Sequence, residues 1–350
     1  MKTKSEKVNL SGGQILAINK NAPEKLFSGD FTAAKMEYYA LSRVWHPDRN
    51  SNREATVVFQ HITELYRTAR ELIKTKSWNG AGILELSAER SRARKLEYFK
   101  RRRFELGEIY LGESEVAFAV ERQFADLFEN AKRQMENFRF ANDSMRKEMA
   151  RFLPAKPEYF AAPERLFMVL PKPADMILLE DLLDYLGGAI DARHVGWIEN
   201  RLYNLACYFE YAGVVHQDIS PRTVFVSPKF HAAVLLGGWW YARPAGEKIK
   251  ALPNRTIKIA PPDVLRRKQA DARVDLELIR RTGREMLGAK TDAQLKTDEK
   301  IPPAMARWFN GATSGSAVTD YELWNNVLEM DFGKPRFVRL EARPEAIYGG

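Results

Sequence analysis

Cysteine is almost absent from this chain, which has a single one, Cys207, among 350 residues. It can therefore form no internal disulfide and no cysteine-based zinc site. Long apolar runs are also missing, because nowhere do about eighteen uncharged apolar residues follow one another, and the lysine-containing start has no stretch suited to a signal peptide. No internal repeat or low-complexity segment is evident. We expect a soluble cytoplasmic protein with no membrane contact.

The composition is that of a folded chain with a moderate basic excess. It is 45% hydrophobic and 11% aromatic, with 55 Lys and Arg against 46 Asp and Glu, a net charge of +9. Such an excess favours acidic partners, such as nucleic acid or an acidic protein surface, without identifying one. The length favours two domains. We predict boundaries that give an amino-terminal segment (1–19), a helical domain (20–76), a linker (77–87), a larger domain (88–340) and a carboxy-terminal tail (341–350).

The first domain is predicted to contain a helix that starts with Asp30 as its N-cap and ends at His46. Pro47 ends it, because proline disfavours helical backbone at the preceding residue. The buried stripe of this helix follows spacings of four, three and four residues: Ala34, Tyr38, Leu41 and Trp45.

A second helix is predicted to start at Ser51, because Ser51 and Glu54 have the spacing of a capping box. Its apolar stripe is Phe59, Ile62, Tyr66, Ala69 and Ile73. The pattern therefore predicts two antiparallel helices, joined by a loop that carries His46, Pro47 and Asp48.

Residues 38–50, YYALSRVWHPDRN, followed by residues 57–66, VVFQHITELY, resemble helices II and III of a J-domain, as found in DnaJ proteins. The resemblance covers about residues 20–76. In that family the His-Pro-Asp loop and the charged face of helix II dock on a DnaK-type (70-kDa heat-shock) chaperone and trigger its ATP hydrolysis, while the J-protein performs no chemistry itself. The resemblance implies that these residues contact the chaperone: Lys35, Tyr39, Arg43, His46, Pro47, Asp48 and Arg49.

The chain lacks the Gly/Phe-rich linker and the paired Cys-x-x-Cys repeats of the general DnaJ proteins. J-proteins without these parts usually serve a particular client protein or location, which the rest of the chain specifies. We therefore expect a client protein as a second partner.

The larger domain is predicted to mix strands and helices. In chain order we expect a strand hairpin (107–111 and 116–120), helices (121–150), a strand pair (166–170 and 176–179), a long helix ending near Tyr211, and a loop with flanking strands (214–226). This order resembles a protein-kinase-like fold over about residues 88–335. Residues 214–226 are similar to the kinase catalytic loop, residues 259–265 to the Ala-Pro-Glu segment, and Asp275 to the buried Asp of the following helix. The predicted fold class is an all-α J-domain hairpin followed by an α+β two-lobed kinase-like domain.

Phosphoryl transfer needs cations around the triphosphate, and the matching positions lack the required residues. Ala119 stands where a kinase has its strand lysine, Thr223 where it has a metal-binding Asn, and Leu236 where it has the Asp of Asp-Phe-Gly. Arg101, Arg102, Arg103 and Phe104 fill the stretch of the phosphate-covering glycines. The degenerate cleft is predicted to comprise Gly107, Ala119, His216, Asp218, Thr223, Leu236 and Gly238.

We accordingly expect no catalysis, no cofactor and no metal in this domain, and we interpret His216 and Asp218 as structural. A true Asp-Phe-Gly occurs at residues 331–333, but it lies far beyond the catalytic-loop match, so we treat it as a coincidence.

Two alternatives remain open. The first is an active atypical kinase with Asp218 as its base, in which Arg101–Arg103 or Lys132 supply the phosphate contacts. The second is nucleic-acid binding beside Tyr98 and Phe99, through the basic residues Arg90, Arg92, Arg94, Lys95, Lys100 and Arg101–Arg103. Salt-dependent binding to an oligonucleotide, if measured, would support the second alternative.

Overall fold

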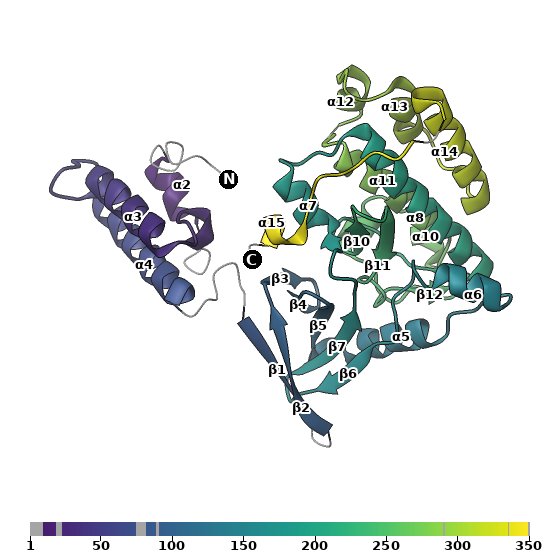
Figure 1. Cartoon of the computed structure of the whole chain (residues 1–350), viewed down its shortest axis with the longest axis horizontal. Coiled ribbons are helices and arrows are strands. Elements are labelled where there is room, and N and C mark those ends of the chain that lie inside the picture. The colour runs from purple at the N-terminus through teal and green to yellow at the C-terminus, as the bar shows by residue number, and fades with distance from the viewer. Residues whose placement is uncertain are drawn as a thin grey trace. The chain divides into compact units, whose positions relative to one another are not determined.

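Helices and antiparallel sheets together make up this α+β protein (Figure 1). The structure is a computed structural model, and it describes residues 10–18, 23–74, 82–88, 91–289, 291–334 and 336–348. The mixed α+β class is as predicted. The chain divides into two compact units. The first unit comprises Met1–Glu85, Arg94–Arg102 and Tyr110–Gly112, and the second comprises Leu86–Ala93, Arg103–Ile109 and Glu113–Gly350.

Two long helices, α3 (Phe31–Trp45) and α4 (Ala55–Lys74), dominate the first unit, and they pack against each other along their length. The Asp30 side chain caps α3 by accepting a hydrogen bond from the Ala33 backbone NH at 2.8 Å. The helix ends at Trp45, because His46 already has extended backbone angles. The predicted first helix is therefore confirmed, including its N-cap.

The predicted start of the second helix is wrong, because α4 begins at Ala55 and no capping box forms around Ser51. Two asparagines instead organise the preceding loop: Asn50 Oδ1 accepts the Asn52 NH at 2.9 Å, and Asn52 Oδ1 accepts the Glu54 NH at 3.0 Å. Asparagine side chains compete well for nearby backbone NH groups. They keep this stretch in turns until Ala55.

The helical domain was predicted to begin at residue 20, but the core of the first unit also includes residues that precede this position. Helix α2 (Gly12–Leu16) and the short η1 (Pro23–Lys25) pack against α4, and His61 Nε2 lies 2.8 Å from the Ile18 carbonyl oxygen. Burying each large aliphatic side chain contributes about 2 kcal/mol. The buried core residues are Ile15, Leu26, Phe27, Ala34, Leu41, Trp45, Val58, Ile62, Leu65 and Ala69.

A five-stranded antiparallel sheet has the strand order β3-β4-β5-β7-β6, and a separate two-stranded sheet is formed by β1 and β2. The predicted hairpin of β4 and β5 is confirmed. Part of the predicted linker forms β1, while residues 75–81 lie outside the described residues. The strands are β1 (Gly82–Ala88), β2 (Ser91–Tyr98), β3 (Lys100–Phe104), β4 (Gly107–Leu111), β5 (Glu115–Glu121), β6 (Glu158–Ala161) and β7 (Arg165–Pro171).

The predicted strand pair 166–170 and 176–179 does not form. Strand β7 pairs with β5 and β6, whereas β8 (Ile177–Leu178) pairs with β10 (Val224–Ser227), which in turn pairs with β11 (Ala232–Leu235). A second small pair joins β9 (Val214–Val215) to β12 (Arg243–Pro244). The partner of β8 is thus the strand at the end of residues 214–226.

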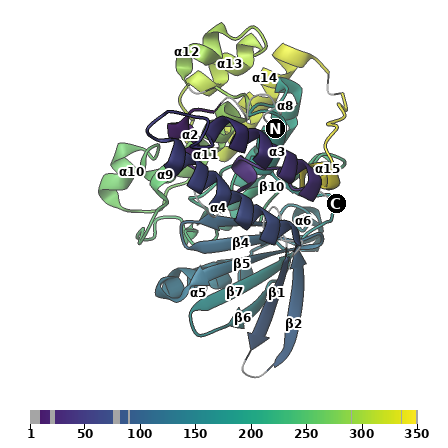
Figure 2. The same cartoon turned by 90° about the vertical axis from the view of Figure 1, so that its left-hand side faces the viewer.

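Helices make up the rest of the second unit, with α8 packed between α11 and α14, and α5 against β5 (Figure 2). The long helix predicted to end near Tyr211 is confirmed as α8. These helices are η3 (Arg122–Phe124), α5 (Ala125–Glu136), α6 (Asp143–Met149), α7 (Leu179–Tyr185), α8 (Ala192–Ala212), α9 (Asn254–Ile257), α10 (Pro262–Arg267), α11 (Arg273–Met286), α12 (Asp292–Thr297), α13 (Pro303–Asn310), α14 (Ala317–Phe332) and α15 (Pro344–Tyr348).

The segment predicted as a carboxy-terminal tail ends in α15, which packs beside α7 (Figure 1). The buried Tyr348 hydroxyl accepts a hydrogen bond from the Leu178 backbone NH at 3.1 Å. Among the described residues, no helix combines the length and the apolar character needed to span a membrane.

Candidate functional site

The loop after α3 is a well-defined turn. The His46 carbonyl oxygen accepts the backbone NH groups of Arg49 and Asn50 at 3.0 and 2.9 Å. The Asn50 side-chain amide donates to the Val44 carbonyl oxygen at 2.8 Å. The loop is therefore tied back onto the last turn of α3, which fixes the position of the residues at its tip.

The His46 ring has a defined orientation although it is partly exposed. It packs edge-on against Phe59 of α4 with ring centroids 5.0 Å apart. Its Nδ1 accepts the Asp48 backbone NH at 3.2 Å. A neutral His46 therefore carries its proton on Nε2. The side chains of His46 and Asp48 are 40% and 84% exposed, so both are available to a partner.

An exposed face of α3 leads into this loop. Lys35, Tyr39 and Arg43 are all exposed, and Lys35 Nζ lies 5.9 Å from the centroid of the Tyr39 ring. Pro47 and Arg49 are exposed in the loop itself. We call this set of residues the α3–loop surface: Lys35, Tyr39, Arg43, His46, Pro47, Asp48 and Arg49.

A second His-x-Asp loop, His216 to Asp218, lies in the second unit between β9 and β10. The buried Asp275 of α11 accepts the backbone NH groups of His216 and Gln217, both at 2.7 Å. Gln217 has a φ of 67°, in the left-handed region that non-glycine residues rarely adopt. Asp275 therefore holds a strained loop in place.

His216 is a neutral structural residue. Its ring is fully buried, stacked on Phe209 and edge-on to Trp239. Burial lowers the pKa of His216 to about 3. Its Nδ1 accepts the Asp218 NH at 3.3 Å, the same arrangement as in the His46 loop. With an uncharged, enclosed ring, His216 organises the loop and does not exchange protons near neutral pH.

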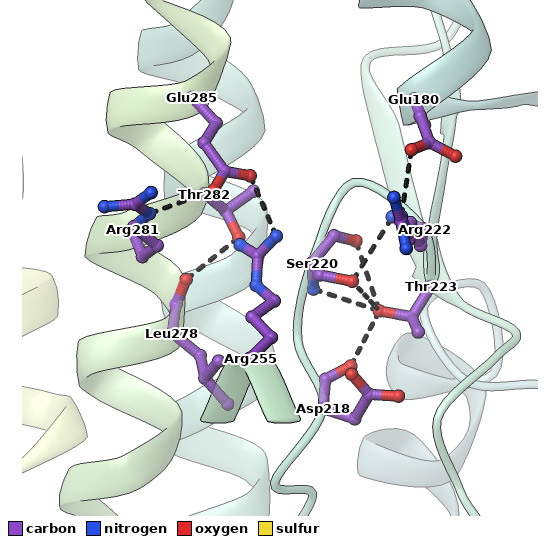
Figure 3. Close-up of polar contacts among 10 residues, drawn as sticks. All are labelled: Glu180, Asp218, Ser220, Arg222, Thr223, Arg255, Leu278, Arg281, Thr282 and Glu285. Atoms are coloured by element: carbon purple, nitrogen blue, oxygen red, sulfur yellow. Dashed lines mark hydrogen bonds and ion pairs between the residues drawn. The ribbon is translucent and has the colours of Figure 1, made fainter. Parts of the chain in front are cut away.

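Thr223 is engaged by the loop itself (Figure 3). Its hydroxyl donates to the Asp218 carbonyl oxygen at 2.7 Å and accepts the Ser220 backbone NH at 3.0 Å. The hydroxyl therefore stabilises the loop rather than offering an oxygen to a metal ion.

The partly exposed Asp218 carboxyl has an unusual environment. Burial raises the pKa of Asp218 to about 8, while the charge of Arg255 acts to lower it and that of Glu105 to raise it. Arg255 is engaged elsewhere, since its Nη1 donates to Glu285 at 2.8 Å (Figure 3). At neutral pH Asp218 is therefore mostly a protonated acid.

Two glycines of the predicted cleft are explained by close packing. A Cβ on Gly107 would lie 2.0 Å from the Ala119 carbonyl oxygen, so only glycine allows β4 to approach β5 here. Gly238 has a φ of 85°, and a Cβ there would lie 2.5 Å from the His216 ring. The structure thus brings Gly107 beside Ala119, and Gly238 beside His216 and Asp218. Leu236 is buried.

An aromatic cluster that sequence reasoning missed connects these two groups of residues. The Phe104 ring stacks on Trp240 at 5.9 Å, and Phe118 meets Trp240 edge-on at 5.5 Å. Phe128 of α5 adds a further ring at 6.2 Å from Trp240. The Trp-Trp pair after Gly238 was visible in the sequence, but its partners are far away along the chain. The segment after Gly238 is therefore packed against the sheet by apolar rings.

Asn130 of α5 is a second residue that sequence reasoning missed. Its buried side-chain amide donates to the carbonyl oxygens of Trp240 and Ala242 at 3.0 and 2.8 Å. Its Oδ1 accepts from Arg133 and Arg243, at 3.2 and 3.1 Å. An isolated asparagine within an amphipathic helix gives no sequence signal. It fixes α5 to the segment that follows Gly238, because its amide bonds two carbonyl oxygens and its Oδ1 bonds two guanidinium groups.

Asp331 of the second Asp-Phe-Gly has a structural role. Its carboxylate accepts the backbone NH groups of Ala304 and Met305 at 3.0 and 2.7 Å, at the start of α13. Negative charge is favourable at a helix N-terminus. This contact accounts for Asp331 without a metal ion.

The basic residues considered for the alternative functions are spread over β2, β3 and α5. Lys132 Nζ lies 5.1 Å from the Tyr159 ring centroid, and Lys95 pairs with Glu85 at 3.1 Å. Arg101 and Arg103 are exposed at alternate positions of β3. Arg90 and the side chain of Arg92 lie outside the described residues.

The sequence matches no protein-family model and no curated protein.

Proposed function

We propose that this protein is a J-domain co-chaperone, which stimulates the ATPase of a DnaK-type chaperone through His46, Pro47 and Asp48. The kinase-like second domain is catalytically degenerate and recognises a client or anchors the protein. The observation that carries the proposal is the ordered, exposed turn between two packed helices, where His46 and Asp48 are accessible to a partner.

The α3–loop surface supports this proposal through its charge and exposure. Lys35 and Arg43 supply positive charge on the face that leads to the loop, and Tyr39 supplies apolar area between them. Positive charge of this kind steers an acidic partner surface into contact, whereas the loop residues determine what the contact does. The two parts of the surface therefore have separable roles, in affinity and in triggering.

A degenerate second domain is supported by the residues around Asp218. Cations and metal ligands that phosphoryl transfer requires are replaced by Ala119, Thr223 and Leu236. The Thr223 hydroxyl is used by the loop, and Asp218 is mostly protonated near neutral pH. A rigid apolar and hydrogen-bonded interior at this place suits a recognition module better than a phosphotransferase.

Binding between the full chain and a purified DnaK-type chaperone tests the proposal. The immobilised wild type is expected to bind the chaperone in ATP and to release it in ADP. Asp48→Asn should lose the ATP-dependent binding, because Asp48 is exposed and lies next to His46. Lys74→Gln, at the far end of α4 and also exposed, is the matched control and should bind like the wild type. Equal ATP-dependent binding by Asp48→Asn would contradict the proposed role of the loop.

A further inference from the structure

A cavity of about 640 Å³ lies in the second unit, between α8, α14 and the chain that follows α14. Its volume is in the range of small-molecule sites. Helices α8 and α14 come close at its base, where a Cβ on Gly196 would lie 2.9 Å from Leu328. The base of the cavity is thus formed by two packed helices.

The walls of this cavity are rich in flat rings. Trp197 stacks on His231 with an interplanar angle of 3° and a centroid distance of 4.5 Å, and Phe337 covers the other face of His231 at 4.2 Å. His231 Nε2 lies 2.9 Å from the Val338 carbonyl oxygen, which holds the chain after α14 in place. Phe332 of α14 completes the aromatic lining.

The charged groups that line the cavity are mostly cations. They are Arg193, Lys334 and Arg336, against a single acid, Glu329. Across the described ranges of the chain, none of these three cations has a carboxylate within ion-pair distance. The Arg193 guanidinium instead lies over the Phe332 ring at 5.5 Å. Cations without a carboxylate partner around an apolar cavity attract an anion. This attraction becomes stronger when the anion displaces water from the cavity.

We propose that this cavity binds a small organic anion with a flat apolar body, whose ring lies against Trp197 and Phe332 and whose acidic group meets Arg193 and Lys334. This activity is separate from the chaperone interaction of the α3–loop surface. Flat apolar bodies suit aromatic walls, and a carboxylate, sulfonate or phosphate group suits guanidinium and ammonium donors.

Fluorescence titration of the full chain with anilinonaphthalene sulfonate, an aromatic anion, tests this proposal. We expect saturable binding of one probe per chain. Double replacement of Arg193 and Lys334 by Gln should weaken the binding about tenfold. Arg151→Gln, in an adjoining cavity of about 460 Å³ on the other side of His231, should leave it unchanged, because Arg151 does not line the proposed site. The neutral probe phenylnaphthylamine, which lacks the acidic group, should bind at least about tenfold more weakly than the anion.

Competition with a second anion distinguishes an aromatic ligand from an aliphatic one. Displacement of the probe by naphthoate but not by decanoate supports a flat aromatic body. Equal affinity in the wild type and the double variant, tight binding of the neutral probe, displacement by decanoate alone, or loss of binding in Arg151→Gln would each overturn the proposal. Circular dichroism of each variant checks that the fold is retained. Neither result bears on the His46 loop, so the proposed co-chaperone function is tested independently.

Discussion

The Gln217 backbone NH donates to the Asp275 carboxylate at 2.7 Å, and this bond holds a residue whose backbone is in the left-handed region. That conformation costs a non-glycine residue roughly 1–2 kcal/mol. Asp275 also accepts the His216 NH, so one buried carboxylate satisfies two buried donors. The loop that carries Asp218 is thus held from α11.

Replacement of Asp275 by Ala should therefore lower the free energy of unfolding of the second unit by about 3 kcal/mol, because two buried NH groups lose their acceptor. Asp275→Asn keeps one carbonyl acceptor and should cost roughly half as much. Urea denaturation followed by tryptophan fluorescence measures both. Equal stability of wild type and Asp275→Ala would show that Asp275 does not hold the loop.

Gly107→Ala should destabilise the protein by roughly 3 kcal/mol in the absence of any nucleotide, because its Cβ would collide with the Ala119 carbonyl oxygen. Gly13→Ala is the matched control, since a Cβ there meets nothing within 4 Å and alanine favours the helix. Thermal unfolding compares the two variants. If Gly107→Ala unfolds like the wild type, the close approach of β4 and β5 is not what requires glycine.

The difference in pH dependence of stability between the wild type and Asp218→Asn should report Asp218, because burial also raises the pKa of Asp275 to about 7 and both proteins keep that group. The pKa of Asp218 is raised from 3.8 to about 8 in the folded chain, so the folded state holds this proton more tightly than the unfolded state. The stability that Asp218 contributes is complete below pH 3.8 and is lost as the pH rises through 8. Relative to Asp218→Asn, the wild type should lose about 2 kcal/mol over this window, a figure discounted for partial exposure.

Urea unfolding of both proteins across the window measures this difference. Asp143→Asn, which removes an exposed carboxylate, should run parallel to the wild type. If the free energy of unfolding of Asp218→Asn also changed with pH in the same way as that of the wild type, the Asp218 carboxyl would be ionised in the folded protein.

Mg²⁺-ATP should not shift the melting temperature of the full chain. A tightly bound nucleotide stabilises a protein by about 2.7 kcal/mol at a hundredfold excess over its Kd, which a thermal scan detects easily. Labelled-phosphate transfer to the protein itself should be absent too, because Ala119, Thr223 and Leu236 supply neither charge nor metal ligands. Transfer by the wild type that disappears in Asp218→Asn would favour the atypical kinase.

Local sequence signals predicted the local structure well. Helix α3 follows from its three-four apolar spacing, Asp30 and Pro47, and each of these acts within a few residues. The start of α4 was missed because Asn52 accepts the Glu54 NH that a Ser51 capping box would have used, while Asn50 accepts the Asn52 NH. The sequence alone does not show which of several neighbouring polar side chains accepts a given backbone NH group.

Contacts between distant segments could not be predicted from the sequence. Strand β8 pairs with β10, and the Tyr348 hydroxyl accepts a hydrogen bond from Leu178, which lies 170 residues earlier in the chain. Residues of the candidate cleft were predicted from their order along the chain, but Asn130 and the rings around Trp240 were not. Their roles arise only when packing brings them together, because an asparagine or a phenylalanine is unremarkable by itself.

The single-turnover ATPase rate of a DnaK-type chaperone, measured with increasing amounts of the full chain, tests the central claim most directly. We predict that the wild type and Lys74→Gln raise the hydrolysis rate in a saturable way. His46→Gln should abolish the increase without unfolding the protein, because the His46 side chain is 40% exposed and its ring packs edge-on against Phe59. Stimulation by His46→Gln equal to that of the wild type, or no stimulation by the wild type, would contradict the account.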